Sequence, residues 1–361
     1  MFDFLEEKLR QQAETGTLRT LPKPLEGIDF FSNDYLGFSR LNFLEIVDNS
    51  GSTGSRLMSG NSAQAEECED KLAEYFDAEA ALVFNSGYAA NLGFWSCVPQ
   101  RGDLILYDSH CHASIIDGIR LSFADKLKFP HNDYQTLEKE LAKYQNRRCF
   151  VAIEGIYSMQ GDFAELKTIL VTANRFGALV VVDEAHSAGV VGDSGRGFVH
   201  GIEELDLCFA RIVTFGKAFG FHGAAVLGSK VLKEYLINFC RPFIYTTALP
   251  PNDYSQITAR LNPTLVREKQ IQLHNNIKKF RALIGENSKL GSSPNSPIQI
   301  WKDKIECLEL IAKNLKNKGI FTKIIHSPTV PKGEECLRIC LHAFNTEEEV
   351  KLLVKGILKI D

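Results

Sequence analysis

Leu179-Val-Val-Val-Asp183-Glu-Ala-His186 is the stretch that indicates how this chain of 361 residues folds. Its continuous apolar run is typical of a strand buried on both faces, as strands of a parallel sheet are. Asp183 ends the run and His186 follows it. Because ligands of open α/β sheets bind just outside the carboxyl ends of strands, we expect both side chains at such an edge. A buried strand that simply ends in a polar turn is the plain alternative.

A second apolar run, Ile212-Val-Thr214, leads into a turn that carries Lys217. Glycines at positions 216 and 220 permit a tight turn there. Alone, such a lysine is equally well explained as a surface charge. With Asp183 and His186 it forms the set that a lysine Schiff base with pyridoxal phosphate needs, since an acidic group keeps the pyridine nitrogen protonated.

Composition limits the classes of protein that fit this chain. It is 44% apolar with a net charge of −4, which predicts a large core and does not favour nucleic acid or an anionic membrane as partner. The start, Met1-Phe-Asp-Phe-Leu-Glu-Glu, lacks the apolar centre of a signal peptide, and no apolar run is long enough to span a bilayer. Nine scattered cysteines without Cys-x-x-Cys pairs indicate reduced thiols, so we expect a cytoplasmic protein.

No metal site is predicted. His110-Cys111-His112 is the one cluster of potential ligands, and three consecutive residues are poorly spaced for one tetrahedral zinc ion.

Strands and helices mostly alternate from Ala80 to Leu227, which predicts a mostly parallel sheet. We expect an N-terminal segment over residues 1–50, a large cofactor-binding domain over 51–250 and a small α+β domain over 251–361. The small domain would include the N-terminal segment, and we expect a long helix over 252–284, which Pro263 interrupts, to link the two domains. Near the start of the chain, residues 21–24 read as a proline-broken extension, and Phe30 to Gly37 as a short strand that ends in a turn.

A strand-turn-helix junction is a candidate phosphate site. The apolar strand Ala80–Phe84 is followed by Asn85-Ser86-Gly87-Tyr88, which opens a helix. Exposed amides at the positive end of a helix bind phosphate well. An ordinary connection between strand and helix would have the same sequence features.

Nine short motifs occur in an order that we associate with one family: Asn33-Asp-Tyr-Leu-Gly37, Gly51-Ser-Thr-Gly-Ser-Arg56, Ser86-Gly-Tyr88, His112-Ala-Ser114, Glu154-Gly-Ile-Tyr-Ser-Met159, Asp183-Glu-Ala-His186, Thr214-Phe-Gly-Lys217, Tyr245-Thr-Thr247 and Pro328-Thr-Val-Pro331. The chain thereby resembles the fold-type I, pyridoxal-phosphate-dependent α-oxoamine synthases, and among them most the members of biotin synthesis. The resemblance implies an α/β fold: a large domain whose mostly parallel, seven-stranded sheet is flanked by helices, plus a smaller α+β C-terminal domain.

The resemblance also implies roles for individual residues. Lys217 would form the Schiff base with pyridoxal 5'-phosphate, Asp183 would pair with the pyridine nitrogen, His186 would contact the ring hydroxyl and His112 would stack on the ring. These four are the expected catalytic residues. The other expected cofactor contacts within the subunit are Gly87, Tyr88, Ser158 and Thr214.

Thr246 and Thr247 match a segment that reaches the cofactor phosphate of a neighbouring subunit, so the resemblance implies a homodimer with shared active sites. Asn33, Thr329 and Arg338 match substrate-facing positions. The planar guanidinium of Arg338 suits an amino-acid carboxylate, although a surface arginine on a strand is the plain alternative.

The implied reaction is the decarboxylative condensation of L-alanine with pimeloyl-CoA, or an acyl-carrier thioester, to 8-amino-7-oxononanoate. Glycine with acetyl-CoA, or another acyl-CoA, remains open as the substrate pair. An inactive partner subunit should lack the Schiff-base lysine, whereas Lys217 is present. A nicotinamide-dependent dehydrogenase needs a Gly-x-Gly-x-x-Gly turn, which Ser86-Gly-Tyr-Ala-Ala does not supply.

Overall fold

The computed structural model describes residues 2–15, 18–19, 21, 26–44, 51–327 and 329–358. The chain forms two compact units. The large one comprises residues 33–158 and 162–273, and the small one comprises residues 1–32, 159–161 and 274–361. This division falls within a helix, after Leu273, so the sequence-based boundaries after residues 50 and 250 stay predictions about folding units. Residues 22–25, which hold most of the expected proline-broken extension, and Pro328 lie outside the described residues.

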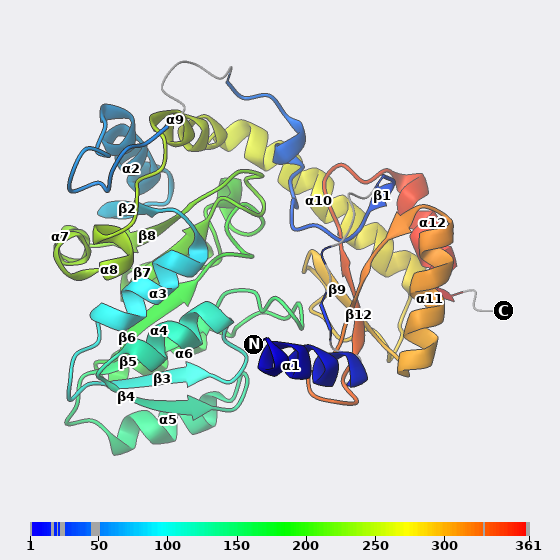
Figure 1. Ribbon diagram of the computed structural model, residues 1–361, viewed down its shortest axis with the longest axis horizontal. Coiled ribbons are helices and arrows are strands. Elements are labelled where there is room, and N and C mark those ends of the chain that lie inside the picture. Colours follow the sequence, from blue (N-terminus) through cyan, green and yellow to red (C-terminus); the bar gives the residue numbers. More distant parts are fainter. Residues whose placement is uncertain are drawn as a thin grey trace. The chain divides into compact units, whose positions relative to one another are not determined.

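A seven-stranded sheet forms the centre of the large unit (Figure 1), which confirms the predicted fold class. Six strands run in the same direction, and only β8 runs the other way, because it pairs antiparallel with both β7 and β2. In spatial order the strands are β2 (Ala80–Phe84), β8 (Ala224–Gly228), β7 (Cys208–Thr214), β6 (Leu179–Asp183), β5 (Cys149–Glu154), β3 (Leu104–Asp108) and β4 (Asp125–Phe129).

Alternate residues of each strand face opposite sides of the sheet, and a hydrophobic core covers each side. In β6, Val181 packs into one core, while Val180 and Val182 pack into the other. The first core is completed by α3 (Gly87–Cys97), α4 (Ala113–Leu121), α7 (Lys230–Phe239) and α8 (Arg241–Ile244). The second is completed by α5 (Tyr134–Lys143) and α6 (Leu166–Arg175).

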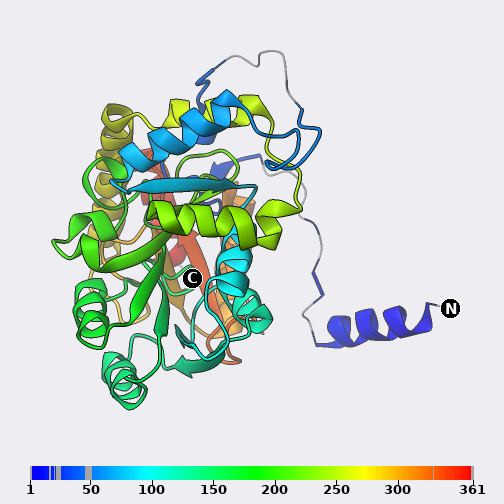
Figure 2. The ribbon, with the colours of Figure 1, turned by 90° about the vertical axis from the view of Figure 1, so that its left-hand side faces the viewer.

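Two further helices of the large unit, α2 (Ala63–Tyr75) and α9 (Pro251–Arg260), lie side by side (Figures 1 and 2). The long helix expected over 252–284 is two helices, because α10 (Pro263–Ile284) starts anew at the proline. Pro263 therefore interrupts the helix as its sequence predicts. Short 3-10 turns connect the remaining elements: η1 (Phe38–Arg40), η2 (Asp193–Gly195), η3 (Val199–Gly201) and η4 (Leu205–Leu207).

The small unit has an antiparallel sheet in the order β11-β12-β9 and a separate parallel pair, β1 and β10. Its elements are α1 (Asp3–Glu14), β1 (Ile28–Asp29), β9 (Ile298–Lys302), α11 (Ile305–Asn317), β10 (Ile320–Phe321), β11 (Lys323–Ile325), β12 (Cys336–Cys340) and α12 (Glu347–Leu358). This α+β pattern is the one predicted for the C-terminal part.

Arg338 lies on the central strand β12 and is 7% exposed, so its alternative interpretation as a surface arginine is wrong. Its guanidinium donates to Sγ of Cys340 at 3.0 Å, because side chains two residues apart on a strand lie on the same face.

The strand expected over Phe30 to Gly37 is absent, which corrects that prediction. The strand ends at Asp29, and the chain then turns. Oδ1 of Asp29 accepts the N–H groups of Phe31 at 2.8 Å and Ser32 at 2.9 Å, which curls the backbone out of the extended form. Within the described part of the chain, no helix is both long and apolar enough to cross a membrane.

Candidate active site

The candidate active site lies where β5, β6 and β7 end. Their parallel register places Glu154 beside Asp183 and Asp183 beside Ile212, two residues before Thr214. Carboxyl ends of parallel strands meet at one edge of a sheet. The lysine, aspartate and histidine singled out from the sequence therefore arrive at one place.

The turn that carries Lys217 is closely pinned. The N–H of Phe215 donates to Gly223 O at 2.9 Å, and the N–H of Gly220 donates to Lys217 O at 2.8 Å. Gly220 has φ +56°, and a Cβ atom there would lie 2.1 Å from the nitrogen of Ser39. Only glycine fits this backbone, so the expected tight turn is observed.

Seven of the expected cofactor residues line one cavity of about 170 Å³. They come from the strand ends, the start of α3 and the start of α4: Gly87, Tyr88, His112, Asp183, His186, Thr214 and Lys217. The same cavity is also lined by Asn91, Ser114, Glu154 and Ala185.

Lys217 begins a chain of hydrogen bonds. Its Nζ lies 2.7 Å from Nε2 of His186, and Nδ1 of that ring lies 2.7 Å from the hydroxyl of Tyr35. Tyr35 in turn donates to Oδ1 of Asn33 at 3.1 Å. The half-buried lysine amine is thus in contact with an imidazole ring, whose two nitrogens can donate and accept hydrogen bonds.

Asp183 is 6% exposed and both of its oxygens accept hydrogen bonds. Asn91 Nδ2 donates to Oδ2 at 2.7 Å, and the N–H of Ala185 donates to Oδ1 at 2.8 Å. Two donors fix the orientation of this carboxylate at the cavity wall. A negative group held in place suits a neighbouring heterocyclic nitrogen that must stay protonated.

Glu154 is a second buried carboxyl group at the cavity, and its Oε1 accepts the backbone N–H of His112 at 2.6 Å. Burial raises the pKa of Glu154 to about 8, and the neighbouring Asp183 adds to the shift while Lys217 opposes it. Burial and the neighbouring Asp183 therefore favour the neutral form of the Glu154 carboxyl group.

The His112 side chain caps the helix that it precedes, since its Nδ1 accepts the N–H of Ser114 at 3.2 Å. Desolvation by the surrounding atoms lowers the pKa of His112, Asp183 opposes this, and Lys217 adds to it. A neutral aromatic ring at the cavity edge is suited to stacking.

The start of α3 provides an anion site in the same cavity. Ser86 caps the helix by accepting the N–H of Ala89 at 3.1 Å, and Gly87 is the first helical residue. The first amides of a helix lack partners within it and carry its positive end. A Cβ atom at Gly87 would lie 3.6 Å from Cβ of Thr214, so the helix start lies close to the end of β7.

These groups fit pyridoxal phosphate, because each reactive part of that molecule finds a counterpart. The lysine amine matches the aldehyde, the Asp183 carboxylate matches the pyridine nitrogen and the helix start matches the phosphate. Oδ1 of Asn91, at the same cavity, is buried without a hydrogen-bond partner in the described structure, which leaves an acceptor available to a ligand.

Other expected site residues do not line this cavity. Ser158 lies in a turn after β5, and Thr246 lines a separate small cavity with Arg56 and Tyr254. Thr247 is exposed, and its carbonyl accepts from Asn85 Nδ2 at 2.9 Å. Thr329 and Arg338 belong to the small unit. Their cofactor and substrate roles stay predictions.

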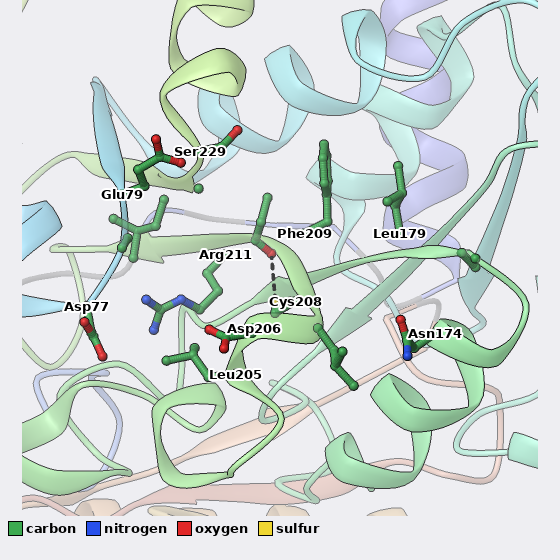
Figure 3. Close-up of a pocket in the computed structure, with 17 residues that line it drawn as sticks. Asp77, Glu79, Asn174, Leu179, Leu205, Asp206, Cys208, Phe209, Arg211 and Ser229 are labelled. Carbon is green, nitrogen blue, oxygen red and sulfur yellow. Dashed lines mark hydrogen bonds between the residues drawn. The ribbon is translucent and has the colours of Figure 1, made fainter.

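A larger cavity of about 510 Å³ lies at the other end of the strands (Figure 3). It is lined by the start of β6 and by Cys208 to Arg211 of β7, and Figure 3 shows Asp77 and Asp206 near the Arg211 guanidinium. None of the expected site residues lines it. Since ligands of such sheets bind at carboxyl ends, the smaller cavity is the better candidate despite its size.

The residues at the site that were not assigned a role from the sequence include Tyr35, Asn91 and Glu154. Glu154 follows a buried apolar strand just as Asp183 does, so the same signal could have identified it. Asn91 lies one helical turn after Gly87 and shares its helix face. Tyr35 belongs to a quoted motif, but its contact with His186 spans 151 positions and leaves no local signal.

Comparisons with known proteins agree with this geometry. The chain matches the family described as aminotransferase class I and II over residues 26–357. It is 38% identical to an 8-amino-7-oxononanoate synthase of Emericella nidulans, covering 98% of this chain and 94% of the relative.

Among solved structures, the chain resembles a serine palmitoyltransferase from S. paucimobilis with a bound PLP–myriocin aldimine. The TM-score is 0.87 and the identity 27%, over 99% of this chain and 96% of that one. An 8-amino-7-oxononanoate synthase from Francisella tularensis aligns with a TM-score of 0.78 and 30% identity over 92% of this chain and 97% of that one.

Proposed function

Because the chain belongs to the aminotransferase class I and II family, we propose that it makes 8-amino-7-oxononanoate for biotin biosynthesis from L-alanine and pimeloyl-CoA or an acyl-carrier thioester. It is a pyridoxal-phosphate-dependent acyltransferase that takes an amino acid and an acyl thioester. One observation carries the proposal: the Lys217 amine shares a cavity with Asp183, His186 and the start of α3.

When bound, pyridoxal phosphate supplies an aldehyde that captures amines and a ring that takes up the electron pair left at the amino-acid α-carbon. Lys217 would hold the aldehyde carbon and, once released, accept the α-proton at Nζ. Asp183 would keep a proton on the ring nitrogen, and His112 would cover one face of the ring. The α3 amides at Gly87 and Tyr88 would hold the phosphate. Thr214 and Ser158 would add cofactor contacts.

The substrate carboxylate would bind Arg338, since a guanidinium pairs with a carboxylate through two parallel hydrogen bonds. We propose Asn33 and Thr329 as further substrate contacts. The Asn33 side chain is already linked to His186 through Tyr35, which supports a place for it near the reacting atoms.

Product analysis tests the choice of substrates. The purified protein is incubated separately with L-alanine, glycine and L-serine, each with pimeloyl-, acetyl- and palmitoyl-CoA, and the products are identified by mass spectrometry. We expect 8-amino-7-oxononanoate from alanine and pimeloyl-CoA as the main product. The serine and palmitoyl arms are included because the chain also resembles a serine palmitoyltransferase. A main product from any other pair would overturn the proposed substrates.

Replacement of Lys217 tests the assigned cavity. Lys217→Ala should lose the visible absorbance of bound cofactor and reduce turnover at least roughly a hundredfold, because both the covalent link and the base are removed. Lys126→Ala, which changes an exposed lysine of β4, is the matched control and should keep the visible absorbance and the turnover. Near-normal turnover of the Lys217 variant would contradict the proposal.

We also propose a homodimer in which Thr246 and Thr247 of one subunit contact the cofactor phosphate of the other. In one chain, neither threonine lines the Lys217 cavity and Thr246 lines a separate one, which supports a role across an interface. A cytoplasmic location is likewise a prediction from the sequence.

A further inference from the structure

Tyr35 connects to Lys217 through the ring of His186. Its side chain is 0% exposed and its ring lies 6.0 Å from the His186 ring, centroid to centroid. The three residues come from separate turns: before η1, after β6 and after β7. A buried tyrosine hydroxyl usually has a specific hydrogen-bond role, because burying it without partners is costly.

The direction of these hydrogen bonds follows from a count of protons. The Tyr35 hydroxyl has one proton, which it donates to Oδ1 of Asn33 at 3.1 Å. It must therefore accept from His186 at Nδ1, 2.7 Å away. A neutral imidazole carries one N–H, so Nε2 has a lone pair and accepts from Nζ of Lys217 at 2.7 Å.

We propose that Tyr35 is a positioning residue whose hydroxyl keeps the His186 ring proton on Nδ1, so that Nε2 can take a proton from the Lys217 ammonium. One N–H bond on Nζ breaks and one forms on Nε2, which leaves an imidazolium whose Nδ1–H still bonds to Tyr35. The electron pair freed on Nζ would then be available to bond the aldehyde carbon, and the aldehyde oxygen would leave as water with the two protons that remain on Nζ. This inference rests on the proposed function in that Lys217 must capture an aldehyde.

Other ionisable groups face the same cavity: His112, Glu154, Asp183 and Tyr88. A substitution at Tyr35 changes none of them. A shift in the pH dependence between wild type and such a variant therefore reports the loss of the hydroxyl rather than a new charge.

Tyr35→Phe removes the hydroxyl and keeps the ring. Tyr157→Phe is a matched control, because Tyr157 is also 0% exposed but its hydroxyl has no hydrogen-bond partner in the described structure.

The first measurement is nitrogen NMR of the His186 ring in the full chain without cofactor. We expect the proton on Nδ1 in wild type and in Tyr157→Phe. Tyr35→Phe should lose the Nδ1 preference. A Tyr35→Phe spectrum with the proton still on Nδ1 would overturn the inference, and so would a wild-type proton on Nε2.

The second measurement is the rate at which visible absorbance develops after pyridoxal phosphate is added, followed across pH. At neutral pH, Tyr35→Phe should be slower by roughly three- to tenfold, the scale of one hydrogen bond, and its profile should move to higher pH. Tyr157→Phe should match wild type. A Tyr35→Phe profile identical to wild type would refute the inference. If wild type takes up no cofactor, the proposed function fails, while the ring spectrum still decides the inference.

Discussion

His131 is a single residue whose ionisation affects the stability of the large unit. Its Nδ1 lies 2.9 Å from Asp108 and its Nε2 lies 2.8 Å from Asp162, so both ring nitrogens face carboxylates. Burial disfavours the charged ring, but hydrogen bonds and charge attraction from the two aspartates outweigh it and raise the pKa of His131 from 6.5 to about 9. The protonated ring thus links the ends of β3 and β4 to the loop after β5.

This pKa shift predicts a pH dependence of stability. A group whose pKa is raised in the folded state stabilises it fully below the unfolded pKa, and the contribution is lost as pH rises through the folded value. The stabilising contribution of His131 is therefore lost between about pH 6.5 and about pH 9. The free energy of unfolding should fall across this range by up to roughly 3 kcal/mol, at 1.36 kcal/mol per pKa unit.

Urea unfolding at several pH values measures this fall in the free energy of unfolding. His131→Gln, which cannot be protonated, should show little slope across that pH range. His200→Gln is the control, because burial and nearby arginines lower the pKa of His200, so its contribution changes only at more acid pH. An unchanged slope in His131→Gln would show that another group causes the dependence.

At the scale of elements, the start of α3 places the phosphate site. Ser86 caps α3 and Ser62 caps α2 in the same way, with hydrogen bonds of 3.1 Å and 3.2 Å to the third residue after each serine. Loss of such a cap costs about 1 kcal/mol. Of these two helices, α3 contributes residues to the cavity lined by Lys217 and α2 does not.

This pair of helices gives a prediction with an internal control. Ser86→Ala and Ser62→Ala should lower the free energy of unfolding by a similar amount, about 1 kcal/mol each. Ser86→Ala alone should also weaken pyridoxal phosphate binding, because the amides of Gly87 and Tyr88 lose their fixed direction. Denaturant unfolding and absorbance titration measure the two effects. Equal cofactor affinity in the two variants would contradict a phosphate site at α3.

Elements differed in how well their sequences predicted them. The strand from Leu179 was predictable because a buried parallel strand is apolar throughout. The strand β4 and helix α5 were not identified. In β4, exposed Asp125, Lys126 and Lys128 hide the apolar pattern, as charges on the edge strand of a sheet often do.

At the scale of the whole molecule, shared active sites make a testable prediction. Light scattering should give a dimer. Lys217→Ala and the double variant Thr246→Ala, Thr247→Ala should each be impaired alone, whereas co-expressed chains should regain up to about a quarter of wild-type activity. The reason is that half of the dimers would be mixed and one of their two sites would be intact. No recovery in mixed dimers would indicate that each subunit binds its cofactor alone.

The sequence by itself determined the mostly parallel sheet, the lysine turn, and the aspartate and histidine at a strand end, because apolar runs, glycines and strand ends are local features of a chain. Only the tertiary structure decided that Glu154 lies beside Asp183, that Tyr35 contacts His186 and that Arg338 is buried. Those contacts depend on strand register and on the packing of segments far apart in the chain, which residue spacing does not encode.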